Sequence, residues 1–176
     1  SLKVLDIKDI VLDFNHLDVF NSLKNKIDLS PNESSKLGNA MMLKDKAEIE
    51  NILSKKNETE IINKLTSLPD FYGDESILKK LKNFLPDQGV ADEIAESLTN
   101  ICKALKKFNV EISFDFSDIR GYQYHTGIVY SAYAQGFNTA VAQGGRYDNM
   151  NKSDMQLRPA TGFSIDLRFI INNLLT

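Results

Sequence analysis

The chain has 176 residues, of which 42% are hydrophobic, and a formal net charge of −3. That length allows one sizeable core, or a core with a smaller packed subdomain. The slightly acidic balance argues against nucleic acid or a membrane surface as a partner, and no apolar run is long enough for a membrane-spanning helix. A single cysteine and the absence of a signal-peptide pattern predict a reducing, cytoplasmic location.

The first predicted element is a strand over residues 7–14, which are rich in Ile, Val and Leu. A helix is expected after it, because Leu17, Phe20 and Leu23 fall on one stripe. The chain opens with Ser1 and its first residues already lead into a strand, so we expect it to be a piece of a longer protein.

Residues 30–109 carry almost only helical signals. Residues 30–33 (Ser-Pro-Asn-Glu) form a capping box with proline at the first helical position. Asn57 is predicted to cap a second helix, and Asp74 a third that ends at Pro86. The strongest pattern covers residues 91–108, where apolar residues recur every three or four positions, at Ile94, Leu98, Ile101, Leu105 and Phe108.

The hydrophobic period changes at Val110. Residues 110–116 alternate between apolar and polar side chains, which predicts a half-buried strand. Two further strands are expected at 122–133 and 137–142, joined by a tight turn at Gln135-Gly136. After the Gly144-Gly145 pair comes a polar loop, and the chain is expected to close with a strand at 159–165 and a helix at 166–175.

These elements predict an α+β fold with a helical block inserted into an antiparallel sheet. Residues 1–29 would begin the core, residues 30–109 would form the helical insertion, and residues 110–176 would complete the core sheet and carry the closing helix.

The composition changes sharply in the last third of the chain. All four arginines and five of the six tyrosines lie between residues 120 and 168, whereas the preceding residues include sixteen lysines and no arginine. A planar guanidinium grips a carboxylate or phosphate through two parallel hydrogen bonds. Six of the nine glycines lie between residues 121 and 162, which suits close approach of the backbone to a ligand. The functional site is therefore expected in this region.

Two short motifs supply the candidate residues: residues 120–127 (Arg-Gly-Tyr-Gln-Tyr-His-Thr-Gly) and residues 143–148 (Gln-Gly-Gly-Arg-Tyr-Asp). Strand alternation would put Tyr122, Tyr124 and Tyr130 on one face, where hydroxyl groups and a guanidinium suit a small zwitterion. Ordinary sheet packing of the tyrosines and a bend at the glycine pair explain the same pattern. The residues alone leave both interpretations open.

No metal, cofactor or nucleophile is expected. His16 and His125 are far apart in the sequence, and no Cys or His spacing suits a metal ion. His125 could contact a ligand or serve as a structural imidazole. Cys102 lies beside the apolar stripe of the 91–108 helix and is interpreted as core.

Residues 120–125 and 144–148 resemble the motifs that line the histidine pocket of histidyl-tRNA synthetases, Arg-Gly-Leu-Asp-Tyr-Tyr and Gly-Gly-Arg-Tyr-Asp. Residues 120–127 are more similar still to the regulatory subunits of ATP phosphoribosyltransferase, a non-synthetase branch of the same family. The closing pattern of that branch is present at residues 158–168 (Arg-Pro-Ala-Thr-Gly-Phe-Ser-Ile-Asp-Leu-Arg). Residues 12–16 and 68–73 are similar as well, so the resemblance spans nearly the whole chain.

The sequence departs from the synthetase pattern at two positions. Gln123 replaces the acid of the pocket motif. If the closing motifs are aligned on Gly162, Phe169 falls where class II synthetases carry an arginine that contacts ATP. Arg168, one helical position away, would point about 100° elsewhere. The resemblance therefore implies a sensor that has lost adenylate formation.

The fold implied by the resemblance is α+β of the class II aminoacyl-tRNA synthetase type, with an antiparallel sheet and a helical insertion. The implied function is that of a non-catalytic regulatory subunit of ATP phosphoribosyltransferase, needed for the first step of histidine biosynthesis and for its feedback regulation by histidine. The implied partner is the short-form catalytic subunit, in a hetero-oligomer in which this subunit forms homodimers.

The resemblance also implies a histidine-like pocket, in which Arg120 would bind the ligand carboxylate and Arg146 would brace the floor. Its other predicted residues are Tyr122, Tyr124, His125, Gly144, Gly145 and Tyr147. One alternative is a catalytic-domain fragment of a histidyl-tRNA synthetase. Another is a free-standing amino-acid-binding module.

Overall fold

A six-stranded mixed sheet lies at the centre of the computed structural model, which describes residues 7–108, 110–121, 125–148 and 159–174. The strand order is β2-β3-β1-β4-β5-β6. The bounds are β1 Ile10–His16, β2 Tyr72–Gly73, β3 Glu111–Asp115, β4 Ile128–Ala134, β5 Ala142–Tyr147 and β6 Ala160–Ser164. The prediction of an antiparallel sheet is correct for the other neighbouring pairs but wrong for β1 and β3, which are parallel.

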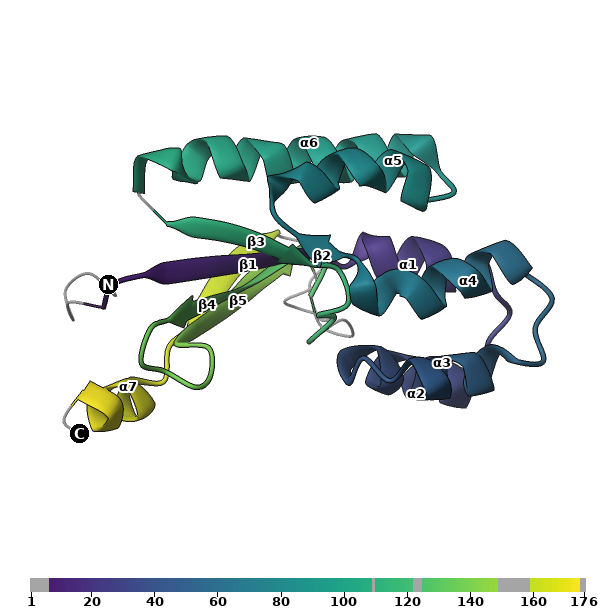
Figure 1. Ribbon diagram of the computed structural model, residues 1–176, viewed down its shortest axis with the longest axis horizontal. Helices are drawn as coiled ribbons and strands as arrows, with labels where there is room; N and C mark the ends of the chain where they lie inside the picture. The colour runs from purple at the N-terminus through teal and green to yellow at the C-terminus, as the bar shows by residue number, and fades with distance from the viewer. Residues whose placement is uncertain (1–6, 109, 122–124, 149–158, 175–176) are drawn as a thin grey trace.

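Most of the helices lie between β1 and β3 in the sequence. They are α1 Asp18–Lys24, α2 Pro31–Met42, α3 Lys46–Leu53, α4 Thr59–Ser67, α5 Leu81–Phe84 and α6 Gln88–Leu105, with short 3₁₀ turns η2 Leu68–Asp70, η3 Glu75–Lys80 and η4 Lys106–Phe108. In Figure 1, α5 and α6 run above the sheet, α1 to α4 stack beyond one end of it, and α7 (Leu167–Leu174) lies near the chain terminus. None of the helices in the described ranges has the length and apolarity to cross a membrane.

Local capping signals account for several of the helix starts. At α2 the capping box predicted from residues 30–33 is confirmed, because the Glu33 N–H donates to Ser30 Oγ and the Ser30 N–H donates to the Glu33 carboxylate at 2.8 Å. Asn57 is not a cap, since Glu58 precedes α4 and makes no capping hydrogen bond through its side chain. Asp74 does cap, but it begins the 3₁₀ turn η3, which α5 then continues.

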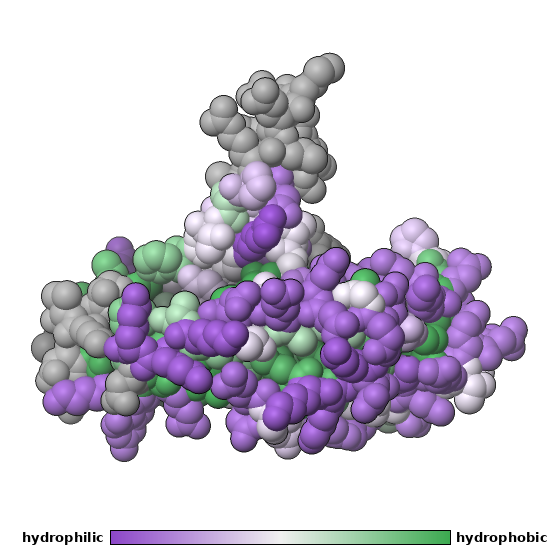
Figure 2. All heavy atoms as spheres, turned by 90° about the horizontal axis from the view of Figure 1, so that it is seen from above, coloured by the Kyte–Doolittle hydropathy of each residue, from purple (hydrophilic) through white to green (hydrophobic). Residues whose placement is uncertain are grey.

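The larger of the two hydrophobic clusters joins the helices to one face of the sheet. It includes the side chains of Phe20, Leu98 and Phe114, each at most 1% exposed. A smaller cluster packs Ile170 of α7 against the neighbouring strands, with Ile7, Ala132, Ala134, Val141 and Ala142. Seen from the side of α6, the outer surface is largely hydrophilic (Figure 2), as expected of solvated helix faces.

The strand boundaries near the glycines differ from the prediction. The expected strand at 122–133 overlaps β4, but the expected strand at 137–142 is wrong, because residues 135–141 connect the two strands and β5 begins only at Ala142. Residues 144–145 lie inside β5 and form no bend. Gly127 adopts a left-handed φ of 73°, so β4 begins only after it. Within the predicted helical segment, β2 forms a short edge strand beside β3.

Lys44, at the corner between α2 and α3, connects the helical segment to the sheet. Its Nζ lies 2.7 Å from Asp115 Oδ2 and 5.0 Å from the centre of the Tyr72 ring. Asp115 also accepts hydrogen bonds from the backbone N–H and hydroxyl of Ser117, in the turn that leads to Arg120. The helical segment is therefore bonded directly to the turn that borders the candidate site.

Candidate ligand-binding site

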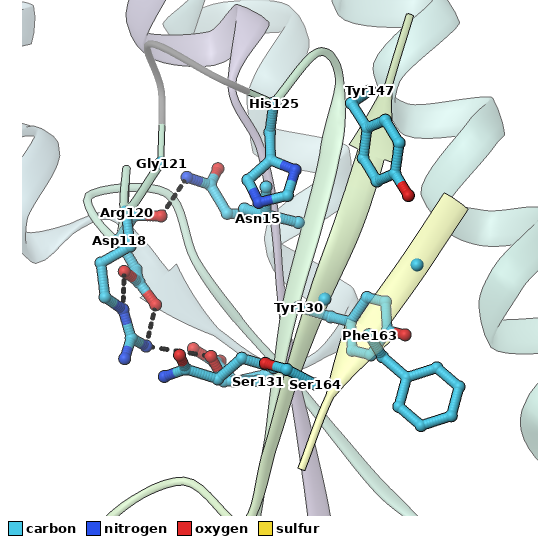
Figure 3. A pocket seen from close by; sticks show the side chains of 15 residues that line it. Asn15, Asp118, Arg120, Gly121, His125, Tyr130, Ser131, Tyr147, Phe163 and Ser164 are labelled. Carbon is cyan, nitrogen blue, oxygen red and sulfur yellow. Dashed lines mark hydrogen bonds and ion pairs between the residues drawn. The ribbon is translucent and has the colours of Figure 1, made fainter. Parts of the chain in front are cut away.

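A cavity of about 410 Å³ lies on the sheet face opposite Phe14. Strands β1, β4, β5 and β6 contribute to its lining, and the turn at residues 118–121 borders one side. Figure 3 shows these groups converging on one space, with His125 and Tyr147 at one end and Arg120 and Ser164 at the other. A volume of this size suits a small-molecule ligand.

The floor of the cavity is a polar row that crosses the sheet. Strand pairing aligns one residue from each of five neighbouring strands: Ser113, Asp13, Ser131, Gln143 and Ser164. Because side chains directly opposite each other in neighbouring strands point to the same face, this row lies on one side of the sheet. The adjacent row points to the other side and includes Phe114 and Phe14, which pack into the helical core.

The glycines of β5 allow unusually close packing on both faces. A Cβ atom on Gly144 would lie 2.4 Å from the Gly162 carbonyl oxygen and 2.6 Å from the Tyr130 hydroxyl. A Cβ atom on Gly145, on the opposite face, would lie 2.9 Å from His125 Nδ1. Any larger side chain at residue 144 or 145 would therefore displace a neighbour, which is why glycine occurs inside this strand.

Arg120 enters the cavity wall already paired with an acid. Its Nε donates to Asp118 Oδ1 at 2.6 Å, and its Nη2 donates to Asp118 Oδ2, so the pair is bidentate. The same Nη2 lies 3.0 Å from Ser131 Oγ and 3.1 Å from the Tyr133 hydroxyl. The hydrogen bond to Asp118 raises the pKa of Arg120. A ligand carboxylate would therefore have to share this guanidinium with Asp118.

His125 and Tyr147 form the wall at the other end. The His125 backbone N–H donates to the Gly121 carbonyl at 2.8 Å, and the rings of His125 and Tyr147 are 6.1 Å apart between centres. A Cβ atom on Gly121, which has a φ of 71°, would lie 2.6 Å from His125 Cδ2. The glycine in the Arg-Gly motif thus leaves room for the imidazole.

The predicted alternation assigned the ligand face to the side of Tyr130, and this stays a prediction. Tyr130 borders the cavity, but its ring packs against Phe14 with 5.9 Å between centres. Ser131, of the opposite parity, aligns with Asp13 on the floor. The tyrosine ring therefore packs on the apolar side of this strand, whereas the polar row lies on the other side.

Two cavity residues from β1 were not predicted. Asp13 accepts a hydrogen bond from Ser113 Oγ, and burial raises its pKa, with the nearby Asp115 and Asp118 carboxylates acting in the same direction. Asn15 is 2% exposed and donates from Nδ2 to the Asp118 carbonyl at 2.8 Å. The sequence feature that could have identified them is an acid and an amide at alternate positions of an otherwise apolar strand.

The structure brings together four of the eight predicted site residues. Arg120, His125, Gly144 and Tyr147 line the cavity. Gly145 and Arg146 are not among its lining residues, and Arg146 Nε instead donates to Asp148 Oδ1 at 3.0 Å. Tyr122 and Tyr124 lie outside the described residues. In the described ranges, no group of three or more His, Cys, Asp or Glu side chains could hold a metal ion.

Comparison with known proteins relates the chain to a family. Residues 1–170 match a family model described as histidyl-tRNA synthetase. The ATP phosphoribosyltransferase regulatory subunit of Nitrosomonas eutropha is 39% identical over 171 residues, which cover 95% of this chain and 44% of that protein. The chain thus spans about half the length of the curated relatives it matches.

Solved structures share the fold. An ATP phosphoribosyltransferase regulatory subunit/histidyl-tRNA synthetase from Bacillus halodurans C matches with a TM-score of 0.82 at 18% identity, covering 98% of this chain and 46% of that one. The ATP phosphoribosyl transferase (HisG:HisZ) complex from Thermotoga maritima matches with a TM-score of 0.66 at 16% identity, covering 93% and 56%. The α+β, class II synthetase-like fold expected from the motifs is therefore confirmed. The chain belongs to the histidyl-tRNA synthetase-like family that includes the regulatory subunits of ATP phosphoribosyltransferase.

Proposed function

We propose that the protein containing this chain is a non-catalytic regulatory subunit of ATP phosphoribosyltransferase. It would be needed for the first step of histidine biosynthesis and for feedback regulation of that step by histidine. The observation that carries this proposal is the 39% identity to such a subunit over 95% of the chain, a span that includes both cavity motifs. The partner would be the short-form catalytic subunit, in a hetero-oligomer.

The cavity would be the histidine sensor of this subunit. Its volume of about 410 Å³ suits an amino acid, with Arg120 for the carboxylate and His125 and Tyr147 as walls. Tyr122 and Tyr124 would complete the walls, and Gly144 and Gly145 would keep the strand close to the ligand. Regulation requires that histidine bind one state of the assembly more tightly than the other, because a ligand shifts an equilibrium only through differential affinity.

A lack of adenylate chemistry is supported by the surroundings of Phe169. Its ring lies 5.8 Å from that of Phe137, and its backbone N–H donates to Asp166 Oδ1. A phenyl ring cannot neutralise a triphosphate, and the neighbouring Arg168 is exposed on α7. Residue 169 thus provides apolar packing at the position where the synthetase pattern has a cation.

The decisive experiment measures phosphoribosyl transfer by the short-form catalytic subunit with and without the full-length protein. We expect a large stimulation that added histidine then suppresses. Absence of any stimulation would contradict the regulatory role. Stimulation that histidine leaves unchanged would retain the subunit assignment and remove the feedback part.

The assignment of Arg120 is tested separately by histidine affinity. Arg120→Ala should weaken histidine binding by the full-length protein about tenfold or more, because a charge-assisted hydrogen bond is lost and Asp118 is left without its partner. Arg168→Ala, which removes an exposed guanidinium outside the cavity, is the matched control. Equal affinity of Arg120→Ala and wild type would show that the ligand carboxylate binds elsewhere.

A histidyl-tRNA synthetase is the second candidate, because the family model that matches residues 1–170 carries that description. Histidine-dependent exchange between ATP and pyrophosphate by the full-length protein is its direct assay. Measurable exchange, without stimulation of phosphoribosyl transfer, would favour the synthetase.

A further inference from the structure

Asn15 is a buried polar side chain in the cavity with one unsatisfied atom. The residue is 2% exposed, and its Oδ1 has no hydrogen-bond partner among the residues that the structure describes. A buried carbonyl oxygen without a partner is destabilising, because it has lost its hydrogen bonds to water and gained none in return. Such an atom in the lining of a cavity indicates a donor that arrives with the ligand.

The orientation of the Asn15 amide is determined by its other end. Nδ2 donates to the Asp118 carbonyl oxygen at 2.8 Å, and a carbonyl can only accept, so the NH₂ group must face Asp118. The amide oxygen then projects away from that turn, on the side where Figure 3 shows His125. Asn15 therefore presents an acceptor, and not a donor, to the cavity.

Asp13 adds a second acceptor on the same face of β1. It lies two residues before Asn15, about 7 Å along the strand, and its side chain lines the same cavity. Its carboxylate accepts from Ser113, and no ion pair joins it to a cationic side chain in the described ranges. The nearby guanidinium of Arg120 is engaged by Asp118.

This part of the cavity thus offers oxygen acceptors and an acid whose charge is not paired. The complementary ligand group is a protonated primary amine, which brings three N–H donors and a positive charge. Burial raises the pKa of Asp13, and a bound cation would favour its ionised form. Arg120 remains in the same cavity as the complement of a carboxylate.

We propose that Asn15 Oδ1, with Asp13 beside it, binds the protonated amine of the ligand, so that the cavity selects α-amino acids over acids of the same shape that lack the amine. The inference rests on the proposed function in one respect, namely that a small amino acid enters this cavity. It assigns a specificity role to two β1 residues outside the Arg-Gly and Gly-Gly motifs.

The test compares two ligands by calorimetry on the full-length protein: histidine and imidazolepropionate, which is histidine with its amino group replaced by hydrogen. Wild type should prefer histidine by about tenfold or more, since an unpaired buried acceptor is costly. Asn15→Leu should remove most of that preference, and Asn15→Asp, which keeps an acceptor, should retain it. Asn51→Leu, at an exposed residue of α3, is the matched control and should behave as wild type.

The ratio of the two affinities separates recognition from folding, because a damaged cavity weakens both ligands alike. Asn15→Leu with an undiminished preference for histidine would overturn the proposal, as would a wild type that does not distinguish the ligands. If Asn15→Leu bound neither ligand, Asn15→Asp would decide, and loss of the preference in that variant would also overturn it.

Failure of this inference is distinguishable from failure of the proposed function. Wild-type protein that stimulates phosphoribosyl transfer, together with Asn15→Leu that keeps its preference, would refute only the role of Asn15. Protein that gives no stimulation, but whose preference depends on Asn15, would refute the regulatory function and leave amine recognition standing.

Discussion

The helical segment from α1 to α6 and the cavity end of the sheet are stabilised in different ways. The helical segment shares a large apolar cluster with one face of the sheet, in which side chains such as Phe20 and Leu98 are completely buried. Among the described residues, the cavity end has a cluster of six buried side chains, and its other face is a row of polar side chains and glycines. Apolar burial stabilises the first region, whereas paired charges and close backbone contacts shape the second.

The same contrast explains the change from lysine to arginine along the chain. Lysines of the helical segment make exposed ion pairs, such as Lys82 with Asp92, that contribute little to stability. Arg120 and Arg146 each pair with an aspartate two residues away. Arginine therefore marks the region of the site, but each of these two guanidiniums is already engaged by the protein. Of these two, Arg120 is the one that lines the cavity.

The largest expected effect is the loss of apolar packing in the helical segment. Phe20→Ala should lower the free energy of unfolding by about 3–5 kcal/mol, because the ring is 0% exposed in the core. Phe108→Ala, at a ring that is 44% exposed, is the control and should cost about 0.5 kcal/mol or less. Denaturant unfolding of the full-length protein measures both. Similar losses for the two variants would contradict the view that apolar burial stabilises the helical segment.

A smaller loss of stability, joined to a loss of binding, is expected at the cavity end. Gly144→Ala introduces a Cβ atom 2.4 Å from the Gly162 carbonyl, and a backbone oxygen cannot move aside cheaply. The cost should be about 1–3 kcal/mol of unfolding free energy, with weakened histidine binding.

The matched control for that variant is Gly89→Ala near the start of α6. There the nearest atom to a new Cβ is the side-chain Asp87 Oδ1 at 3.3 Å, which can shift. Alanine favours a helix over glycine by about 0.5–1 kcal/mol, so this variant should be as stable as wild type or more stable. Equal destabilisation of both glycine variants would show that strand spacing at Gly144 has no special importance.

The smallest expected effect concerns pH. The raised pKa of Asp13 means that the folded state favours the protonated carboxyl group. This contribution to stability is fully present below pH 3.8, the ordinary pKa of the group, and is lost as the pH rises through the higher pKa of the folded state. Asp13→Asn should therefore gain stability over wild type near neutral pH and lose that advantage in acid, while binding amino acids more weakly. A stability difference that is constant from about pH 3 to 8 would contradict this account.

Local signals explain which parts of the fold were predictable. The Ser30 capping box and the apolar stripe of α6 depend on residues three or four positions apart, which interact wherever a helix forms. The alternation that predicted β3 is local in the same way. The short strand β2 was missed, because two residues carry no periodicity and its pairing with β3 is a tertiary contact.

The site was predicted in part for the same reason. The motifs that contain Arg120, His125, Gly144 and Tyr147 were identified because each is a contiguous pattern with a family resemblance. The arrangement of these residues in space could not be predicted from the motifs. The positive φ of Gly127 and the extension of β5 through Gly145 altered the expected strands, and with them the face that each side chain occupies.

The sequence by itself determined the capped start of α2, the alternating strand at β3 and the region in which to look for a site, because these depend on neighbours within a few residues. Only the tertiary structure decided the parallel pairing of β1 with β3, which aligns Asp13 with Ser113. It also brought Asn15 to Asp118 across 103 residues of chain. Such contacts follow from strand register. Register is set by packing of the whole sheet against the helices, so no pattern of neighbouring residues predicts it.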